Sequence, residues 1–402
     1  MTRAKTKRKP NRPDRALRLA ASAKRLAGQP MFRLLAKAKE LERRGKRILH
    51  FEIGEPDFAT PVHISRAAIR ALKSGDTHYT SSMGTRELRG TVVRSLGRTH
   101  GFTPSLDQVL ITPANAAIYF AVRVLVNPGE EVIVPDPGFS TYYSVLAYTG
   151  ARAVHVPLRE ANGFRMHPAD IEHRITPKTR LIIVNSPQNP TGAVMNRAEI
   201  AAVANIAEQH SLFLLSDEIY RQLTYGKPAP SPALTDRCRK RTLLLSGFSK
   251  AYAMTGWRLG YVVGPEPVIE KMGLLLQTII SCLPGFVQQA GIAALEGDQA
   301  PVRRMRDEYR RRRDLMVSGL NALPGVTCLK PEGALYVFPN ITATGMTSQE
   351  FADFMLDRAG VALLPGSNFG PAGEGYARLC YASSTATIKE ALRCMAQALG
   401  QR

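Results

Sequence analysis

Two reactive side chains stand at the ends of long apolar runs. Asp217 follows the run Leu212–Ser216. Lys250 follows Ser249 at the end of the run Thr242–Phe248. A buried carboxylate is unfavourable unless a cation or several hydrogen-bond donors meet it, so we expect a positive group to face Asp217. An amine held among apolar side chains has a lowered pKa and becomes nucleophilic, which is what Schiff-base chemistry requires.

Two other run ends carry groups that bind polar ligands. The segment Ile183–Gly192 contains two prolines, which favour an irregular loop that aims the amide of Asn189. A plain turn is the alternative interpretation of this loop. In the segment Ile111–Ile118 the chain passes from a strand to a helix, and the first backbone N–H groups of a helix suit a phosphate.

These run ends belong to a pattern of short apolar runs separated by segments of helical length. The pattern predicts an α/β fold, with a mainly parallel seven-stranded sheet covered by helices on both faces. Ligands bind outside the carboxyl ends of the strands in such a sheet, so we expect the four run ends to meet in one site. The expected strands are Val109–Thr112, Glu131–Pro135, Ala153–Pro157, Leu181–Asn185, Leu212–Asp217, Thr242–Ser246 and Leu259–Gly264.

The sequence divides into three predicted parts. Residues 61–294 contain the sheet and form a large domain. Residues 31–60 and 295–402 form a smaller α+β domain, because a helical repeat that ends near Gly45 precedes the sheet and further strand-like segments follow a long helix. Residues 1–30 lack a strong apolar repeat and are interrupted by prolines, so we interpret them as a basic mobile tail.

The positive charge lies mainly near the N-terminus. Residues 1–47 hold 17 Lys and Arg against 3 Asp and Glu, which is +14 of the net charge of +21. The rest of the chain is mildly basic, so a nucleic-acid partner is not expected. An organellar presequence and a nucleic-acid contact are alternative interpretations of the basic segment, although serine is scarce there. The run Arg310–Arg313 is interpreted as the solvated face of a helix.

Cysteine usage and hydropathy indicate the compartment. The five cysteines lie far apart without a C-x-x-C pair, so we expect free thiols in a reducing compartment and no metal site. No stretch of the sequence is long and apolar enough to span a membrane, and the N-terminus lacks the apolar segment of a secretory signal. We therefore expect a cytoplasmic protein without a membrane partner.

Several separated motifs together resemble one known family. They are Gly54-Glu-Pro-Asp-Phe58, Asn189-Pro-Thr-Gly192, Asp217-x-x-Tyr220, Ser249-Lys250, Thr255-Gly-Trp-Arg258-x-Gly260 and Gly373-Glu-Gly-Tyr-Ala-Arg378. In this order and at this spacing they resemble the class I/II aminotransferases, fold-type I enzymes that use pyridoxal phosphate, and within them the aspartate-aminotransferase-like class I gamma branch. The resemblance runs from about Pro30 to the C-terminus. It implies transfer of an amino group between an L-amino acid and a 2-oxo acid.

The resemblance implies roles around the cofactor ring. Lys250 would hold the cofactor as an aldimine and then carry a proton between the substrate α-carbon and the cofactor. Asp217 would pair with the ring nitrogen and keep it protonated, so that the ring draws electrons from the substrate. Tyr220 and Asn189 would donate hydrogen bonds to the ring oxygen. Phe139 would stack on the ring.

The resemblance also implies the phosphate contacts. Arg258 and Ser249 would bind the phosphate together with the helix start at Ala114 and Asn115. Tyr79 would reach it from the partner subunit, which implies a homodimer with shared sites.

Substrate binding is the last implication of the resemblance. Arg378 would grip the substrate α-carboxylate as a bidentate fork, beside Gly54 and Asn189. A β-eliminating C–S lyase on the same fold is an alternative function that these residues leave open. An alternative from another class is a non-catalytic nucleic-acid-binding or regulatory protein.

The substrate side chain is expected to be uncharged. Phe32, Ile53 and Leu283, near which we expect it to lie, are apolar, and Thr112–Ala117 contains no lysine. A second carboxylate buried without a cation is strongly unfavourable. We expect aliphatic or aromatic amino acids as donors, with 2-oxoglutarate or pyruvate as acceptor.

Overall fold

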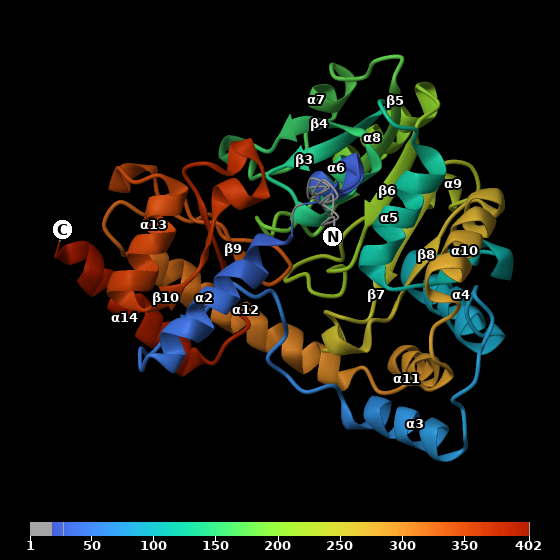
Figure 1. Ribbon diagram of the computed structural model, residues 1–402, viewed down its shortest axis with the longest axis horizontal. Helices are drawn as coiled ribbons and strands as arrows, with labels where there is room; N and C mark the ends of the chain where they lie inside the picture. The colour runs from blue at the N-terminus through green and yellow to red at the C-terminus, as the bar shows by residue number, and fades with distance from the viewer. Residues whose placement is uncertain (1–17, 27, 402) are drawn as a thin grey trace, which may run out of the picture.

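The computed structural model describes residues 18–26 and 28–401. Figure 1 shows two lobes. The large lobe is the set of elements around a seven-stranded sheet, and the small lobe is the set around a two-stranded and a three-stranded sheet. Residues 1–17 and 27 of the expected basic tail lie outside the described residues, and helix α1 (Ala21–Lys24) lies in its described part.

The predicted seven-stranded sheet is confirmed. Each expected strand is present, with ends within two residues of the expected ones. The strands are β2 (Val109–Ile111), β3 (Glu131–Asp136), β4 (Arg152–Pro157), β5 (Thr179–Asn185), β6 (Phe213–Asp217), β7 (Thr242–Gly247) and β8 (Gly260–Val263).

The topology of the sheet brings the reactive strand ends together. The strand order is β2-β8-β7-β6-β5-β3-β4, and only β8 runs antiparallel to its neighbours β2 and β7. In the central parallel part, Asn185 of β5 pairs with Asp217 of β6, which pairs with Leu245 of β7. Three successive carboxyl ends therefore lie side by side at one edge.

The central strands of the sheet are buried on both faces, which explains their continuous apolar runs. Along β3, Val132 and Val134 join one apolar core and Ile133 joins another, because successive side chains point to opposite faces. The first core includes residues of α4, α5, α10 and α11, and the second includes residues of α7 and α8. Figure 1 shows α5 and α8 on the sheet.

The helices have the following bounds. Besides α1 they are α2 (Pro30–Arg43), α3 (Val62–Lys73), α4 (Arg86–His100), α5 (Ala114–Leu125), α6 (Ser140–Thr149), α7 (Pro168–Glu172), α8 (Arg197–Gln209), α9 (Ala233–Asp236), α10 (Glu266–Ile280), α11 (Gly285–Glu296), α12 (Ala300–Asn321), α13 (Ser348–Phe354) and α14 (Thr385–Gly400). As expected, α2 is followed by Gly45, whose φ of 86° suits glycine. No helix in the described part of the chain is long and apolar enough to cross a membrane.

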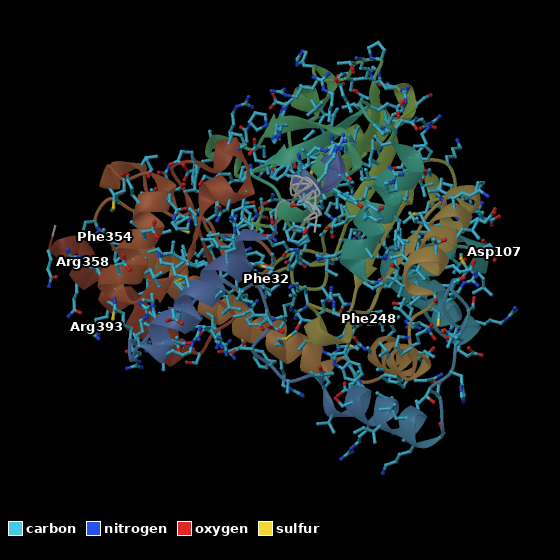
Figure 2. All side chains as sticks on the ribbon, viewed as in Figure 1. Phe32, Asp107, Phe248, Phe354, Arg358 and Arg393 are labelled. Carbon is cyan, nitrogen blue, oxygen red and sulfur yellow. The ribbon has the colours of Figure 1, made fainter. Side chains whose placement is uncertain are left out.

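The small lobe has its own apolar core, formed mainly by α12, α14 and short strands. β1 (Leu49–His50) pairs in parallel with β10 (Val361–Ala362). β12 (Ala377–Cys380) lies between β11 (Leu364–Pro365) and β9 (Tyr336–Val337), antiparallel to both. In Figure 2, Phe32 is labelled near the start of α2, between the two lobes.

The interpretation of Arg310–Arg313 as a solvated face is wrong for two of its members. Arg312 and Arg313 are buried. Arg312 donates to both carboxylate oxygens of Asp57 at 2.8 Å, and Arg313 donates to the carbonyl of Pro331 at 2.9 Å. These contacts attach α12 to neighbouring loops, and a buried guanidinium is tolerated because its donors are used.

Candidate active site

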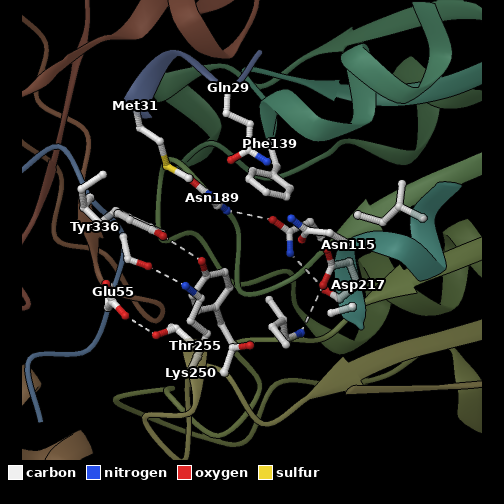
Figure 3. A pocket seen from close by; sticks show the side chains of 18 of the residues that line it. Gln29, Met31, Glu55, Asn115, Phe139, Asn189, Asp217, Lys250, Thr255 and Tyr336 are labelled. Carbon is white, nitrogen blue, oxygen red and sulfur yellow. Dashed lines mark hydrogen bonds between the residues drawn. The ribbon is translucent and has the colours of Figure 1, made fainter. Parts of the chain in front are cut away.

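A cavity of about 490 Å³ opens at the carboxyl ends of β5, β6 and β7 and is lined by both lobes (Figure 3). It brings together every predicted site residue except Tyr79. Those residues are Gly54, Ala114, Asn115, Phe139, Asn189, Asp217, Tyr220, Ser249, Lys250, Arg258 and Arg378.

Asp217 is buried at the end of β6, with 4% of its surface exposed. The hydroxyl of Tyr142 donates to Oδ2 at 2.6 Å, and the backbone N–H of Ile219 donates to Oδ1 at 3.2 Å. Burial nevertheless raises the pKa of Asp217 to about 6. Within the described residues no cation forms an ion pair with this carboxylate. It therefore suits a positively charged group from a ligand.

Lys250 points into the same cavity from the loop after β7. Its Nζ donates to the carbonyl of Gly54 at 2.5 Å and lies 5.9 Å from the centre of the Tyr220 ring. Burial lowers the pKa of Lys250 to about 8. The neutral, nucleophilic amine is thus accessible near neutral pH, as the sequence predicts.

Arg378 is a buried cation of the small lobe, with 2% of its surface exposed. Nη2 donates to the carbonyl of Glu52 at 2.5 Å, and Nη1 donates to Oδ1 of Asn189 at 3.3 Å. The guanidinium lies 4.5 Å from the centre of the Tyr336 ring. Its Nε has no hydrogen-bond partner among the described residues. A buried guanidinium with an unused donor suits a carboxylate.

Tyr336 lies in contact with both Tyr220 and Gly54. The hydroxyls of Tyr220 and Tyr336 share a hydrogen bond of 2.8 Å. A Cβ atom at position 54 would overlap the Tyr336 hydroxyl, so only glycine lets the main chain pass this close to the cavity.

The other end of the cavity suits an anion. Ala114 and Asn115 begin α5, and the first N–H groups of a helix have no acceptor within it. Arg258 has a positive φ of 56°, which is unfavourable for a residue other than glycine, and it donates to the carbonyl of Thr255 at 2.7 Å. Ser249 lies beside them in the lining. An arginine and free helix amides together bind phosphate well.

These features fit pyridoxal phosphate. The buried carboxylate suits a protonated ring nitrogen, the amine suits an aldehyde, and the helix start with its arginine suits a phosphate. The cavity also has the size usual for small ligands, roughly 300 to 1,000 Å³. In the described part of the chain, no group of three or more His, Cys, Asp or Glu side chains is placed to hold a metal ion.

Tyr79 lies outside the cavity of its own chain. It stands in the connection between α3 and α4, and 88% of its surface is exposed. The next residue, Thr80, donates through its hydroxyl to the carbonyl of Leu283 at 3.0 Å.

The N-terminal segment contributes more to the cavity than we expected. Gln29, in the stretch interpreted as a tail, lines the cavity and donates to the hydroxyl of Thr141 at 3.0 Å. Phe32 and Ile53 line the cavity, as expected for the substrate side chain. Leu283 was expected near them, but it is buried elsewhere.

Sequence reasoning missed three important residues. Tyr142 donates a hydrogen bond to the carboxylate of Asp217, and Tyr336 contacts both Tyr220 and Arg378. Asn185 donates to the carbonyl of Asp217 at 3.0 Å and accepts from the backbone of Asn189 at 2.8 Å. Asn185 was detectable, because it ends an expected strand beside the one that ends in Asp217. Tyr142 follows Phe139 by one helical turn, which is a weaker signal.

Comparison with known proteins agrees with this site. The family model "Aminotransferase class I and II" matches residues 46–394. An aspartate aminotransferase of Pyrococcus horikoshii is 40% identical over 370 residues, 90% of this chain and 94% of that protein. An arginine–pyruvate transaminase of Pseudomonas aeruginosa is 40% identical over 375 residues, 92% of this chain and 94% of that protein.

A solved structure extends the likeness to the fold. The aspartate aminotransferase of Thermus thermophilus with maleate superimposes with a TM-score of 0.91 at 35% identity, over 95% of this chain and 100% of that one. The chain therefore belongs to the class I and II aminotransferases, enzymes that use pyridoxal phosphate to move an amino group between an amino acid and a 2-oxo acid.

Proposed function

We propose that this cavity transfers the amino group of L-amino acids with an uncharged side chain to a 2-oxo acid. The observation that carries the proposal is the presence of Lys250, Asp217 and Arg378 in one cavity. They supply a nucleophilic amine, a partner for a ring nitrogen and a carboxylate clamp. These are the three groups that amino-group transfer on a pyridine ring requires.

The proposed catalytic residues are Lys250, Asp217 and Tyr220. Pyridoxal phosphate, when bound, supplies the ring that takes up the electron pair left when the substrate α-C–H bond breaks. Lys250 accepts the proton at its Nζ and returns it, which its pKa of about 8 favours. Asp217 holds the proton on the ring nitrogen. Tyr220 and Asn189 donate hydrogen bonds to the ring oxygen.

The remaining assigned groups hold the cofactor in place. Arg258 and Ser249 bind the phosphate, together with the backbone N–H groups of Ala114 and Asn115 at the start of α5. Phe139 lies at the cavity wall and covers the ring face.

The substrate carboxylate is assigned to Arg378, next to Asn189 and Gly54. The planar guanidinium, whose Nε has no partner among the described residues, can then bind the carboxylate through the bidentate fork that carboxylates favour. The guanidinium is already oriented by the carbonyl of Glu52, so little entropy is lost when the substrate binds.

The charges that remain in the lining favour an uncharged substrate side chain. The cations of the lining are Lys250, Arg258 and Arg378, and all three have an assigned partner. The lining also holds two acidic residues: Asp217, which is assigned to the ring nitrogen, and Glu55, which accepts a hydrogen bond from the hydroxyl of Thr255. A second substrate carboxylate would meet an anion and no unassigned cation among the described lining residues.

A homodimer is part of the proposal. Large apolar side chains are exposed on α3 and α10. Tyr79, which follows α3 in the chain, is exposed as well. The exposed residues are Val62, Ile69, Leu72, Leu274, Ile279 and Ile280. Large apolar side chains that are exposed in a single chain favour burial against a second copy. We assign Tyr79 to the phosphate of the partner's cavity.

We also propose the domain division and the compartment expected from the sequence. The large domain is 61–294, and the small domain combines 31–60 with 295–402, which the separate apolar core of the small lobe supports. All five cysteines are free, which supports a reducing compartment such as the cytoplasm.

A half-reaction screen tests the substrate class. The enzyme loaded with pyridoxal phosphate is mixed with each of the twenty L-amino acids without an acceptor, and the loss of cofactor absorbance is timed. Neutral aliphatic or aromatic amino acids should react on the order of 100-fold faster than aspartate and glutamate, because an unpaired buried carboxylate costs about 3 kcal/mol. Rapid conversion by aspartate alone would overturn the proposed substrate class.

A further inference from the structure

His50 lies between two carboxylates at the edge of the small lobe. Its Nδ1 is 2.8 Å from Oε1 of Glu52, and its Nε2 is 3.0 Å from Oε1 of Glu42. An ionised carboxylate only accepts hydrogen bonds, so both ring nitrogens must carry a proton to satisfy both contacts. Partial burial alone lowers the pKa of His50, but the two carboxylates outweigh burial and raise it above its ordinary value.

The Glu52 side chain is unusual because it is fully buried. Its Oε1 contacts His50, and its Oε2 has no hydrogen-bond partner among the described residues. A buried carboxylate with one unused oxygen depends strongly on the partner that it has. His50, when it carries a proton on Nδ1, donates to Oε1 and offsets part of the cost of burying this carboxylate.

The main chain at Glu52 reaches the active site directly. Its carbonyl accepts from Nη2 of Arg378, and two residues further on the carbonyl of Gly54 accepts from Lys250. The segment from 52 to 54 thus orients both the carboxylate clamp and the reactive amine. A shift of this segment would change the direction of the Arg378 fork.

Among the described residues, few other charged groups lie near His50. On α2, Lys39 forms an ion pair with Glu42, with 3.8 Å between Nζ and Oε2. The strand paired with β1 is Val361–Ala362, which has no titratable side chain. On α14, Glu390 forms an ion pair with Arg47, with 2.7 Å between Oε2 and Nη2. Glu42 and Glu52 are therefore the two groups whose charge His50 balances.

We propose that His50 and Glu52 are positioning residues for Arg378, so that the charged His50–Glu52 pair sets the affinity of the enzyme for substrate carboxylates. The inference rests on the carboxylate role proposed for Arg378. Protonated His50 keeps Glu52 and its carbonyl in place, and the clamp binds tightly. When His50 loses its proton as the pH rises, the clamp loses its orientation and carboxylates bind more weakly.

The test uses 3-phenylpropionate, a carboxylate without an amino group, as a probe of the loaded enzyme. Its dissociation constant is measured from pH 6 to 10 for the wild type, His50→Gln and Glu52→Gln. Glu40→Gln is the matched control, because Glu40 lies on α2 and pairs with Arg43 and Arg44 away from the site. Arg378→Lys reports separately on the proposed clamp.

We expect His50→Gln and Glu52→Gln to weaken probe binding about tenfold at pH 7, and to raise KM for a neutral amino acid by a larger factor than they lower kcat. The wild type should lose affinity at high pH in a step that is absent from His50→Gln, and Glu40→Gln should resemble the wild type. Unchanged affinity in both variants, or the same pH profile in the wild type and His50→Gln, would overturn the inference. If Arg378→Lys also bound normally, the proposed clamp itself would be wrong. Should Glu52→Gln fail to fold, the pH profiles of the wild type and His50→Gln decide the question.

Discussion

Replacing Tyr142 with phenylalanine removes the 2.6 Å hydrogen bond that its hydroxyl donates to Asp217. Both residues are buried, and the acceptor is the carboxylate that we assign to the ring nitrogen. A hydrogen bond to a charged group contributes about 1.5 to 3 kcal/mol. One pKa unit corresponds to about 1.4 kcal/mol, so the pKa of Asp217 should rise by about one to two units in Tyr142→Phe.

A more basic Asp217 competes with the ring nitrogen for the proton that they share. The ring is then a weaker electron acceptor, and kcat should fall by about 10- to 150-fold if the whole interaction is lost in the transition state. The assay is steady-state transamination at saturating amino acid, with the bound cofactor quantified from its absorbance so that occupancy and turnover are separated.

Tyr143→Phe is the matched control for this experiment. Tyr143 is the next residue on α6, and its hydroxyl donates to the carbonyls of Pro135 and Phe369 at 2.7 and 2.9 Å. This variant loses a hydroxyl from the same helix without touching Asp217, so its stability should fall while its kcat stays near the wild-type value. Wild-type kcat in Tyr142→Phe at full cofactor occupancy would refute the role of this hydrogen bond.

Three further predictions follow from the same geometry. Lys250→Ala should abolish the borohydride-reducible adduct between the protein and pyridoxal phosphate, and a surviving adduct would place the reactive amine elsewhere. Mixing Tyr79→Phe with Lys250→Ala subunits should restore one intact site in each mixed dimer, about a quarter of wild-type activity, whereas no recovery would contradict sites shared between subunits. In the cofactor-free protein the pKa of Asp217 is raised from 3.8 to about 6, so stability falls as the pH rises from about 4 to 6. Asp217→Asn should therefore raise the Tm of the cofactor-free protein at pH 7.5 and weaken cofactor binding, and an unchanged Tm would contradict the assigned pKa.

The central part of the fold was predictable because its physical cause is local in the sequence. Strands buried on both faces need unbroken apolar runs, and runs such as Leu181–Asn185 stand out in any reading of the chain. A polar residue at the end of such a run is equally visible, which is why Asp217, Lys250 and Asn189 were found. The topology then brings these residues together without further information.

The rest of the site depends on contacts between segments far apart in the chain. Tyr142 and Tyr336 resemble ordinary core aromatics in sequence, and only the packing of α6 and β9 shows that their hydroxyls reach Asp217 and Tyr220. Arg312 has the composition of a solvated helix face, yet Asp57 neutralises it in the interior. Gln29 reaches the cavity because α2 starts beside it. Contacts between residues this far apart in the chain leave no pattern in the sequence around either residue.

The most direct test of amino-group transfer is a single-turnover experiment on the enzyme loaded with pyridoxal phosphate. Leucine and S-methylcysteine are supplied in excess, separately and without an acceptor, and the products are quantified per active site. We predict about one equivalent of the 2-oxo acid of each amino acid, together with the aminated cofactor and without free ammonia. Repeated release of pyruvate, ammonia and methanethiol from S-methylcysteine would show β-elimination instead and would contradict transamination as the activity of this site.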